Sequence, residues 1–105
     1  MKNIQLTCAH ALVKYLIAQK TLIDGKKVPL FPGVFGIFGH GNVACLGQAL
    51  QENQKKLPTW RGHHEQNMAL TGIAYSRAKR RKQIFVATSS VGPGSTNMIT
   101  AAAVA

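Results

Sequence analysis

Three short apolar runs, each followed by a glycine-rich or polar turn and then by a helical pattern, constrain the fold of this chain most. The runs span residues 34–38, 57–61 and 84–88. The first and the last are apolar on both faces, as strands buried in a parallel sheet are. Strands that alternate with helices predict an α/β fold with three layers and a parallel sheet.

Helical spacing of apolar residues places helices around these strands. Thr7 is the predicted N-cap of a helix over residues 8–20. A turn is predicted at Asp24 and Gly25, and the prolines that follow predict irregular backbone up to residue 33. Further helices are predicted after residue 42, over residues 65–81 and after residue 94.

The charge of the chain raises the question of a nucleic-acid partner. Thirteen Lys and Arg stand against three Asp and Glu, which gives a net charge of +10. The basic residues cluster over 77–82, at a predicted helix C-terminus, where the helix dipole favours cations. No aromatic residues interleave with them, so no nucleic-acid partner is predicted, although a small basic binding module stays open as an alternative.

Several features predict a cytoplasmic protein that does not enter a membrane. No apolar run approaches the ~20 residues that a membrane span needs, and the N-terminal residues lack the apolar region of a secretory leader. Cys8 and Cys45 are far from any metal-type spacing and are predicted to be reduced, buried thiols. Residues 101–105 are good helix formers with no terminating residue, which predicts that the chain is part of a longer one.

Glu65 is the best single candidate for chemistry. It is one of only three acidic residues, and the other two, Asp24 and Glu52, lie in a polar turn and at a predicted helix end. Glu65 follows a predicted strand and opens a predicted helix. Open α/β sheets bind their ligands beyond the carboxyl ends of the strands, which is where this carboxylate is expected.

Two glycine-rich turns are expected at the same edge of the sheet as Glu65. They cover residues 39–44 and 89–97. Glycine lets a ligand approach the backbone closely, and the N-terminus of a helix offers free N–H groups. The first turn also fits G-x-G-x-x-A, a loose dinucleotide fingerprint, and that alternative remains open although it leaves the second turn unexplained.

The polar residues at this edge also raise the question of a metal site. His40, His63 and His64 accompany Glu65. Adjacent residues of a strand point to opposite faces, so His63 and His64 do not easily share one ion. No metal ligands are therefore predicted in this chain.

The motifs together resemble the N-terminal, pyrimidine-binding domain of thiamine diphosphate-dependent enzymes, the superfamily of acetohydroxyacid synthase and benzoylformate decarboxylase. The resemblance rests on residues 35–42, on residues 64–69 with 72–76, and on residues 88–97, in matching order and spacing. It implies that residues 1–105 are a partial pyrimidine-binding domain, truncated at its C-terminal end. Within the superfamily the chain is most similar to hydrolases that cleave a carbon–carbon bond of a cyclic 1,2-dione in inositol catabolism, with a carboligase or decarboxylase as the alternative.

The resemblance also implies roles for individual residues. Glu65 would be catalytic, bonding N1′ of the cofactor's aminopyrimidine so that the ring can take the proton from C2 of the thiazolium. Other residues that would contact the cofactor are Gly39, Gly92, Pro93, Gly94 and Asn97, and those that would face the substrate are His40, Thr88, Ser89 and Ser90. The resemblance implies that a separate domain holds Mg²⁺ and the diphosphate. The implied partners are a small-molecule substrate and further copies in a homodimer or homotetramer. The fragment alone would be inactive.

Overall fold

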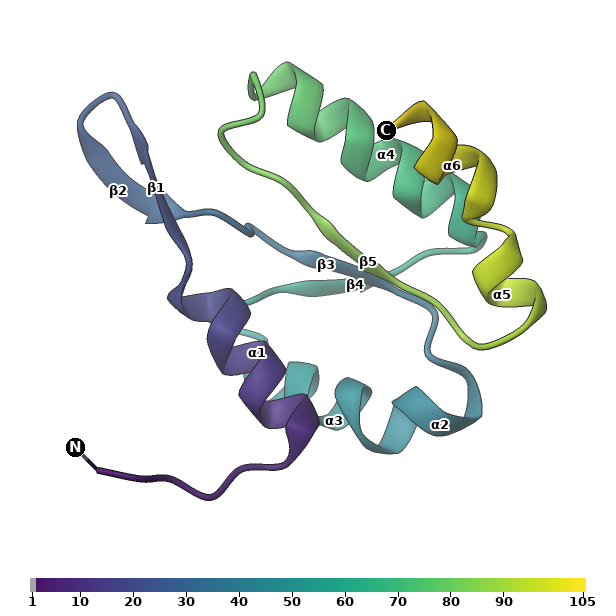
Figure 1. The fold of residues 1–105 in the computed structure, drawn as a ribbon, viewed down its shortest axis with the longest axis horizontal. Helices are drawn as coiled ribbons and strands as arrows, with labels where there is room; N and C mark the ends of the chain where they lie inside the picture. The colour runs from purple at the N-terminus through teal and green to yellow at the C-terminus, as the bar shows by residue number, and fades with distance from the viewer. Residues whose placement is uncertain (1) are drawn as a thin grey trace.

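A parallel sheet lies between two layers of helices in the computed structural model, which describes residues 2–105 (Figure 1). This arrangement confirms the predicted α/β fold. The helices below the sheet in Figure 1 are α1 (Cys8–Ala18), α2 (Gly39–Ala44) and α3 (Leu46–Glu52), and those above it are α4 (Glu65–Ala78) and α6 (Ile99–Val104), with the short α5 (Pro93–Thr96) at one end.

The sheet has three strands in the order β4-β3-β5, all parallel. They are β3 (Val34–Gly36), β4 (Thr59–Arg61) and β5 (Val86–Thr88), so each predicted strand is present but shorter than expected. The central Gly36 is level with Arg61 on one side and Thr88 on the other. All three strands therefore end together at one edge, called the carboxyl edge from here on.

The two faces of the sheet are packed differently. Val34 faces α1 and α3, and the core there is aliphatic, made of Val13, Leu16, Val34, Ala49, Leu50 and Leu57. The opposite face is aromatic. Phe35 stacks on Phe85 with 4.7 Å between ring centroids, Tyr75 of α4 meets Phe85 edge-on at 4.8 Å, and Trp60 lies 5.9 Å from Phe85. Apolar packing on both faces holds so small a sheet between its helices, although Trp60 stays 48% exposed on the aromatic face.

A β-hairpin surrounds the predicted turn at Asp24 and Gly25, and its second strand lies in the stretch that was predicted to be irregular. β1 (Lys20–Ile23) and β2 (Lys26–Pro29) pair antiparallel. Asp24 and Gly25 join them in a two-residue turn with φ of 52° and 78°, as a type I′ turn requires. The prediction was wrong because the lysine-rich strands carry no clear apolar face, although the Asp-Gly pair marks the hairpin.

Two predicted helices end or break earlier than expected. Helix α1 stops at Ala18. The helix predicted after residue 42 already begins at Gly39, within the predicted turn, and it is divided at Cys45, whose φ of −107° and ψ of −78° interrupt the regular backbone. Cys45 and Cys8 are exposed free thiols, so the prediction that they are buried was wrong. Both stand at helix ends, where side chains project away from the core.

Helix α4 ends at Ala78 rather than at residue 81. The N–H of Arg81 donates to the carbonyl of Ser76 at 2.7 Å, and the N–H of Arg80 donates to that of Arg77 at 3.0 Å. These two bonds are a Schellman motif, which requires left-handed backbone after the last helical residue. Arg80 and Arg81 supply it with φ of 53° and 61°. No helix within residues 2–105 is both long and apolar enough to pass through a membrane.

Candidate functional site

Glu65 is the first residue of α4 and lies at the carboxyl edge, four positions beyond the last residue of β4. Its exposed fraction is only 9%, which is unusual for a carboxylate. The preceding residue, His64, caps the helix, and its Nδ1 accepts from the backbone N–H of Gln66 at 3.2 Å. The cap and the helix N-terminus hold Glu65 in place and favour its negative charge.

The loop after β5 supplies the groups that surround this carboxylate. Nδ2 of Asn97 donates to Oε2 of Glu65 at 3.0 Å. Gly94 lies against the other oxygen, since a Cβ at this position would come within 3.2 Å of Oε1. The carboxylate from the end of β4 is thus enclosed by a loop that lies about thirty residues further along the chain.

The pKa of Glu65 is lowered from its ordinary value. The largest cause is the hydrogen bond from Asn97, followed by a bond from the backbone N–H of Glu65 itself. Burial acts in the opposite direction, and the nearby His64 adds a small lowering effect. Hydrogen bonds to the charged form outweigh desolvation, so Glu65 is an ionised acceptor at neutral pH.

The two glycine-rich turns meet at the same edge, as the sequence predicted. Nδ2 of Asn42, in the first turn, donates to the backbone carbonyl of Ser89 in the second at 3.2 Å. Gly39 has a φ of 65° and packs directly against Ser90, because a Cβ on Gly39 would overlap the Ser90 hydroxyl. The close approach of the two backbones therefore depends on glycine at position 39.

The hydroxyl residues after β5 are partly occupied by local bonds. The carbonyl of Thr88 accepts from the N–H of Ile37 at 3.2 Å, which extends the sheet by one bond. The hydroxyl of Ser89 donates to the carbonyl of Ser90 at 3.1 Å and lies 3.5 Å from the hydroxyl of Ser95. These residues line the turn near Glu65, and their hydrogen bonds hold the turn in shape.

Gly92 and Pro93 start the short helix that carries Asn97 to the carboxylate. Gly92 has a φ of 62° and a ψ of −122°, and Pro93 is the first residue of α5. Such backbone is open to glycine and closed to most other residues. Asn97 is the C-cap of α5. The sequence predicts only that it contacts the cofactor, and its bond to Glu65 is seen only in the structure.

His40 is exposed in the first turn of α2, close to a pocket of about 460 Å³. That pocket opens between α2, α3 and the ends of β3 and β4, and its lining includes Phe38, Gly39, Val43, Leu50, Thr59 and Arg61. A second pocket of about 230 Å³ is lined in part by His63 and His64. Neither pocket includes Glu65 among its lining residues.

The histidines do not assemble with acidic residues into a cluster. Within residues 2–105, no three His, Cys, Asp or Glu side chains lie close enough to bind one metal ion. His64 instead uses its ring as a helix cap, and His63 is exposed. The residue that the sequence did not single out is Asn42. Its position just after the Gly-His-Gly turn is the only sequence signal for its bond to Ser89.

Glu65 and the two glycine turns lie at the carboxyl edge of a parallel sheet, which is where open α/β domains bind their ligands. The family described as "Thiamine pyrophosphate enzyme, N-terminal TPP binding domain" matches residues 32–105, and the chain belongs to this family.

Curated relatives are similar over the whole chain. It is 53% identical to a 3D-(3,5/4)-trihydroxycyclohexane-1,2-dione hydrolase of Geobacillus thermodenitrificans, 51% identical to one of Bacillus thuringiensis and 50% identical to one of Clostridium tetani. Each match covers all 105 residues of this chain and 16% of the relative. The chain thus spans about a sixth of the length of these relatives.

Proposed function

We propose that this chain is the N-terminal, pyrimidine-binding part of a thiamine diphosphate-dependent hydrolase that cleaves a carbon–carbon bond of 3D-trihydroxycyclohexane-1,2-dione in myo-inositol catabolism. The observation that carries the proposal is the buried Glu65, held ionised by Asn97 at the carboxyl edge of the sheet. The relatives that share about half of its residues over the whole chain carry the name of this hydrolase.

The residues at the carboxyl edge fit the pyrimidine end of the cofactor. A ring nitrogen needs a carboxyl group in a largely dry site as its hydrogen-bond partner, and Glu65 is such a group. Gly94, lacking a side chain, leaves its backbone close to Oε1 of that carboxylate. Gly39, Gly92 and Pro93 shape the two turns around it, and Asn97 orients it.

The diphosphate and Mg²⁺ need a different set of ligands. Mg²⁺ prefers carboxylate, carbonyl and water oxygens in an octahedral arrangement. Residues 2–105 bring together no cluster of acidic side chains that offers this. We therefore assign the metal and diphosphate to a part of the full-length protein outside this chain, and we expect the 105 residues alone to be inactive.

Thiamine diphosphate, when bound, supplies a thiazolium ring that serves as an electron sink for cleavage next to a carbonyl group. The contribution of Glu65 is to hold a proton at N1′ of the aminopyrimidine and to return it in the reverse step. Its lowered pKa suits this work, because a weakly basic carboxylate shares the proton with the ring nitrogen instead of retaining it.

The substrate-facing side of the site is formed by the two turns. His40 is exposed and free to orient a carbonyl or to move a proton. Thr88, Ser89 and Ser90 border the same edge, and their hydroxyl and backbone groups can bond the hydroxyls of a cyclic polyol-derived dione. We further propose that the full-length protein works in the cytoplasm as a homodimer or homotetramer, with no nucleic-acid or membrane partner.

The decisive experiment is turnover of the trihydroxycyclohexanedione by the full-length protein, with and without thiamine diphosphate and Mg²⁺. Ring opening that needs the cofactor, and that falls by about a hundredfold or more in Glu65→Gln, would support both the reaction and the role of Glu65. Cofactor binding without turnover of the dione would leave a carboligase or decarboxylase of the same superfamily as the function. If thiamine diphosphate did not bind the full-length protein, the proposal would be wrong.

A further inference from the structure

The hydrogen bond between Asn97 and Glu65 has a direction that constrains where a proton can be. Nδ2 of Asn97 is an amide nitrogen, which donates hydrogen bonds and accepts none. It lies 3.0 Å from Oε2 of Glu65. Oε2 must therefore present a lone pair to Asn97, and an Oε2 that carried a proton toward this nitrogen would leave the two hydrogens facing each other. Because an N–H bonds an unprotonated carboxyl oxygen more strongly than a hydroxyl oxygen, the bond favours a proton on Oε1.

Within residues 2–105, the one side-chain hydrogen bond to the Glu65 carboxylate goes to Oε2 and not to Oε1. Gly94 lies beside Oε1, and a Cβ at this position would come within 3.2 Å of that oxygen. Glycine at position 94 therefore keeps space beside the oxygen that any other residue would restrict. Asn97 thus holds Oε2, and Oε1 is the carboxylate oxygen that receives no hydrogen bond from another side chain of the described residues.

We propose that Asn97 is a positioning residue that directs the proton shared between Glu65 and the cofactor to Oε1. This inference rests on the proposed function, because it assumes that N1′ of the aminopyrimidine is the group that meets Glu65. Asn97 acts on the cofactor only through the Glu65 carboxylate. Gly94, which has no side chain, keeps Oε1 accessible to N1′.

Cofactor affinity should therefore depend on pH through Glu65. In the free protein Glu65 is ionised, and its complex with N1′ holds one proton between Oε1 and the ring nitrogen, so binding takes up one proton from water. Affinity then falls by about tenfold per pH unit between the pKa of the free carboxyl group and the pKa at which the complex loses this proton. Asn97 lowers that pKa, with His64 and the N–H of Glu65 as the other groups that lower it and burial opposing them. Removal of the Asn97 amide raises it, so the fall in affinity should begin at a higher pH.

The test compares two ligands on the full-length protein. One is thiamine diphosphate, and the other is an analogue in which carbon replaces N1′, so that it carries the same diphosphate but takes up no proton at Glu65. Affinities are measured by calorimetry with Mg²⁺ between about pH 5 and pH 8, and their ratio isolates the proton at N1′ from every other titrating group. The variants are Asn97→Ala and Asn97→Asp, the second of which keeps the size of the side chain while it removes the donor.

Asn42→Ala is the matched control. It removes an amide of the same kind, bonded at 3.2 Å to the carbonyl of Ser89 in the same loop, but it does not touch the carboxylate. We expect the affinity ratio to begin its fall at a higher pH in both Asn97 variants, most strongly in Asn97→Asp, and to keep its wild-type pH dependence in Asn42→Ala.

The outcomes separate this proposal from the proposed function. An Asn97 variant that binds both ligands more weakly by the same factor at every pH, while Glu65→Gln abolishes the pH dependence, would overturn the role of Asn97 and leave that of Glu65 intact. If Glu65→Gln left the ratio and its pH dependence unchanged, the proposed function of Glu65 itself would fail.

Discussion

Left-handed backbone occurs at both edges of the sheet, but different residue types adopt it at each edge. At the carboxyl edge the left-handed residues are glycines, Gly39 with a φ of 65° and Gly92 with 62°. At the opposite edge Asp24, Arg80 and Arg81 adopt φ between 52° and 61° despite their side chains. Such backbone costs a non-glycine residue roughly 1–2 kcal/mol. Close approach requires glycine only at position 39, where a Cβ would overlap Ser90, whereas Gly25 and Gly92 have positive φ but nothing within 4 Å of their Cβ positions.

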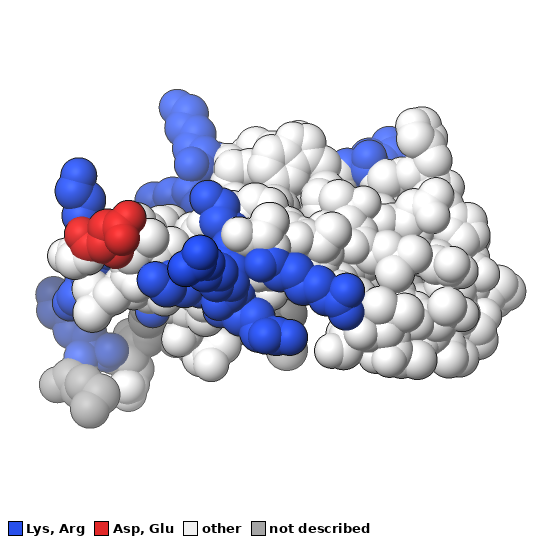
Figure 2. Space-filling model, turned by 90° about the horizontal axis from the view of Figure 1, so that it is seen from above, with Lys and Arg blue, Asp and Glu red and all other residues white. Residues whose placement is uncertain are grey.

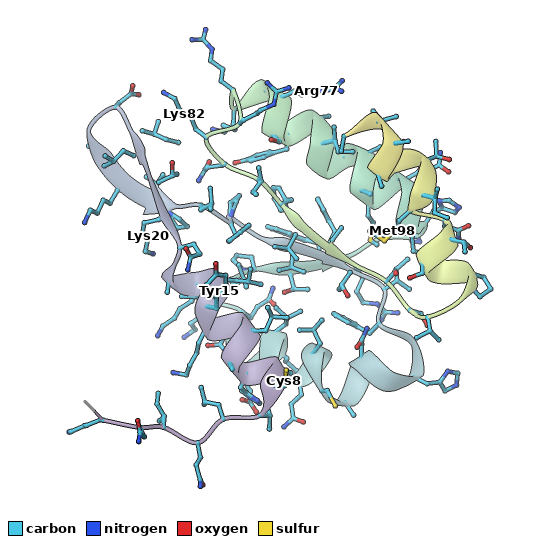
Figure 3. All side chains as sticks on the ribbon, in the orientation of Figure 1. Cys8, Tyr15, Lys20, Arg77, Lys82 and Met98 are labelled. Atoms are coloured by element: carbon cyan, nitrogen blue, oxygen red, sulfur yellow. The ribbon has the colours of Figure 1, made fainter. Side chains whose placement is uncertain are left out.

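The chemical character of the two edges differs in the same way. Figure 2 shows Lys and Arg side chains gathered over one part of the molecule, while much of the same face carries none. Arg77 and Lys82 lie toward the end of α4 that is opposite α5 (Figure 3). Side chains there project into water, so strain and charge are tolerated. At the carboxyl edge a single carboxylate is enclosed by backbone and amide groups.

The largest effect that would sharpen this comparison is expected from Gly39→Ala. The new Cβ would overlap Ser90 and would also require a left-handed alanine. We expect the free energy of unfolding to fall by about 3 kcal/mol, as measured by urea unfolding of the full-length protein. Gly41→Ala, two residues away, is the matched control, because nothing lies within 4 Å of its Cβ position. Equal effects of the two substitutions would show that the contact of Gly39 with Ser90 does not matter.

A smaller effect of opposite sign is expected from Arg80→Gly. Arg80 occupies the left-handed position of the Schellman motif, where glycine is preferred. Replacing it should raise the free energy of unfolding by about 1 kcal/mol, because the strain is removed. Arg80→Ala removes the same charge and keeps the strained backbone, so it should give little or none of this gain. A gain of the same size in both variants would trace the effect to charge and not to backbone.

The sequence foretold the carboxyl edge better than the rest of the fold. Because the carboxyl ends of parallel strands share one edge, the residues that follow each strand, Glu65 and the two glycine turns, could be placed together from the sequence. The hairpin of β1 and β2 was missed because its stability comes from the Asp24-Gly25 turn and from pairing, while its lysine side chains show no buried face. The bond between Asn97 and Glu65 could not be foreseen, since it depends on the exact path of the loop through Gly92.

The end of α4 was misjudged for a related reason. Residues 77–82 are good helix formers that suit a helix C-terminus, so propensity alone extends the helix. Tertiary structure ends it earlier, because Gln83 must bond the carbonyl of Pro29 at 2.8 Å and the hydroxyl of Tyr75 at 3.1 Å. These contacts connect the segment after α4 to β2 of the hairpin and to α4. The sequence did not predict the hairpin, so it could not predict these contacts.

The smallest expected effects concern the acid side of the stability profile. The pKa of Glu65 and that of Glu52 are both lowered, by hydrogen bonds from Asn97 and from His10 respectively. A carboxyl group whose pKa is lowered on folding contributes stability above its ordinary pKa, and this contribution is lost as the pH falls through the lowered value. Glu65→Gln and Glu52→Gln should therefore each reduce the loss of stability on acidification.

Salt should distinguish the two carboxylates. The pair of His10 and Glu52 joins side chains that are 26% and 53% exposed, at 2.7 Å, so salt should weaken its contribution. Glu65 is bonded to a neutral amide and is only 9% exposed, so its contribution should change little. Unfolding curves at low and high salt across the acid range measure both, and an equal salt dependence would contradict the view that the two environments differ.

The central claim, that Glu65 shares a proton with the cofactor, is tested most directly by counting protons taken up on binding. Calorimetric titrations of the full-length protein with thiamine diphosphate, in two buffers with different ionisation enthalpies, give this number at neutral pH. Wild type is expected to take up about one proton more than Glu65→Gln, because only the ionised carboxylate must acquire one to meet N1′. Equal proton uptake by the two proteins, with the cofactor bound to both, would contradict the account.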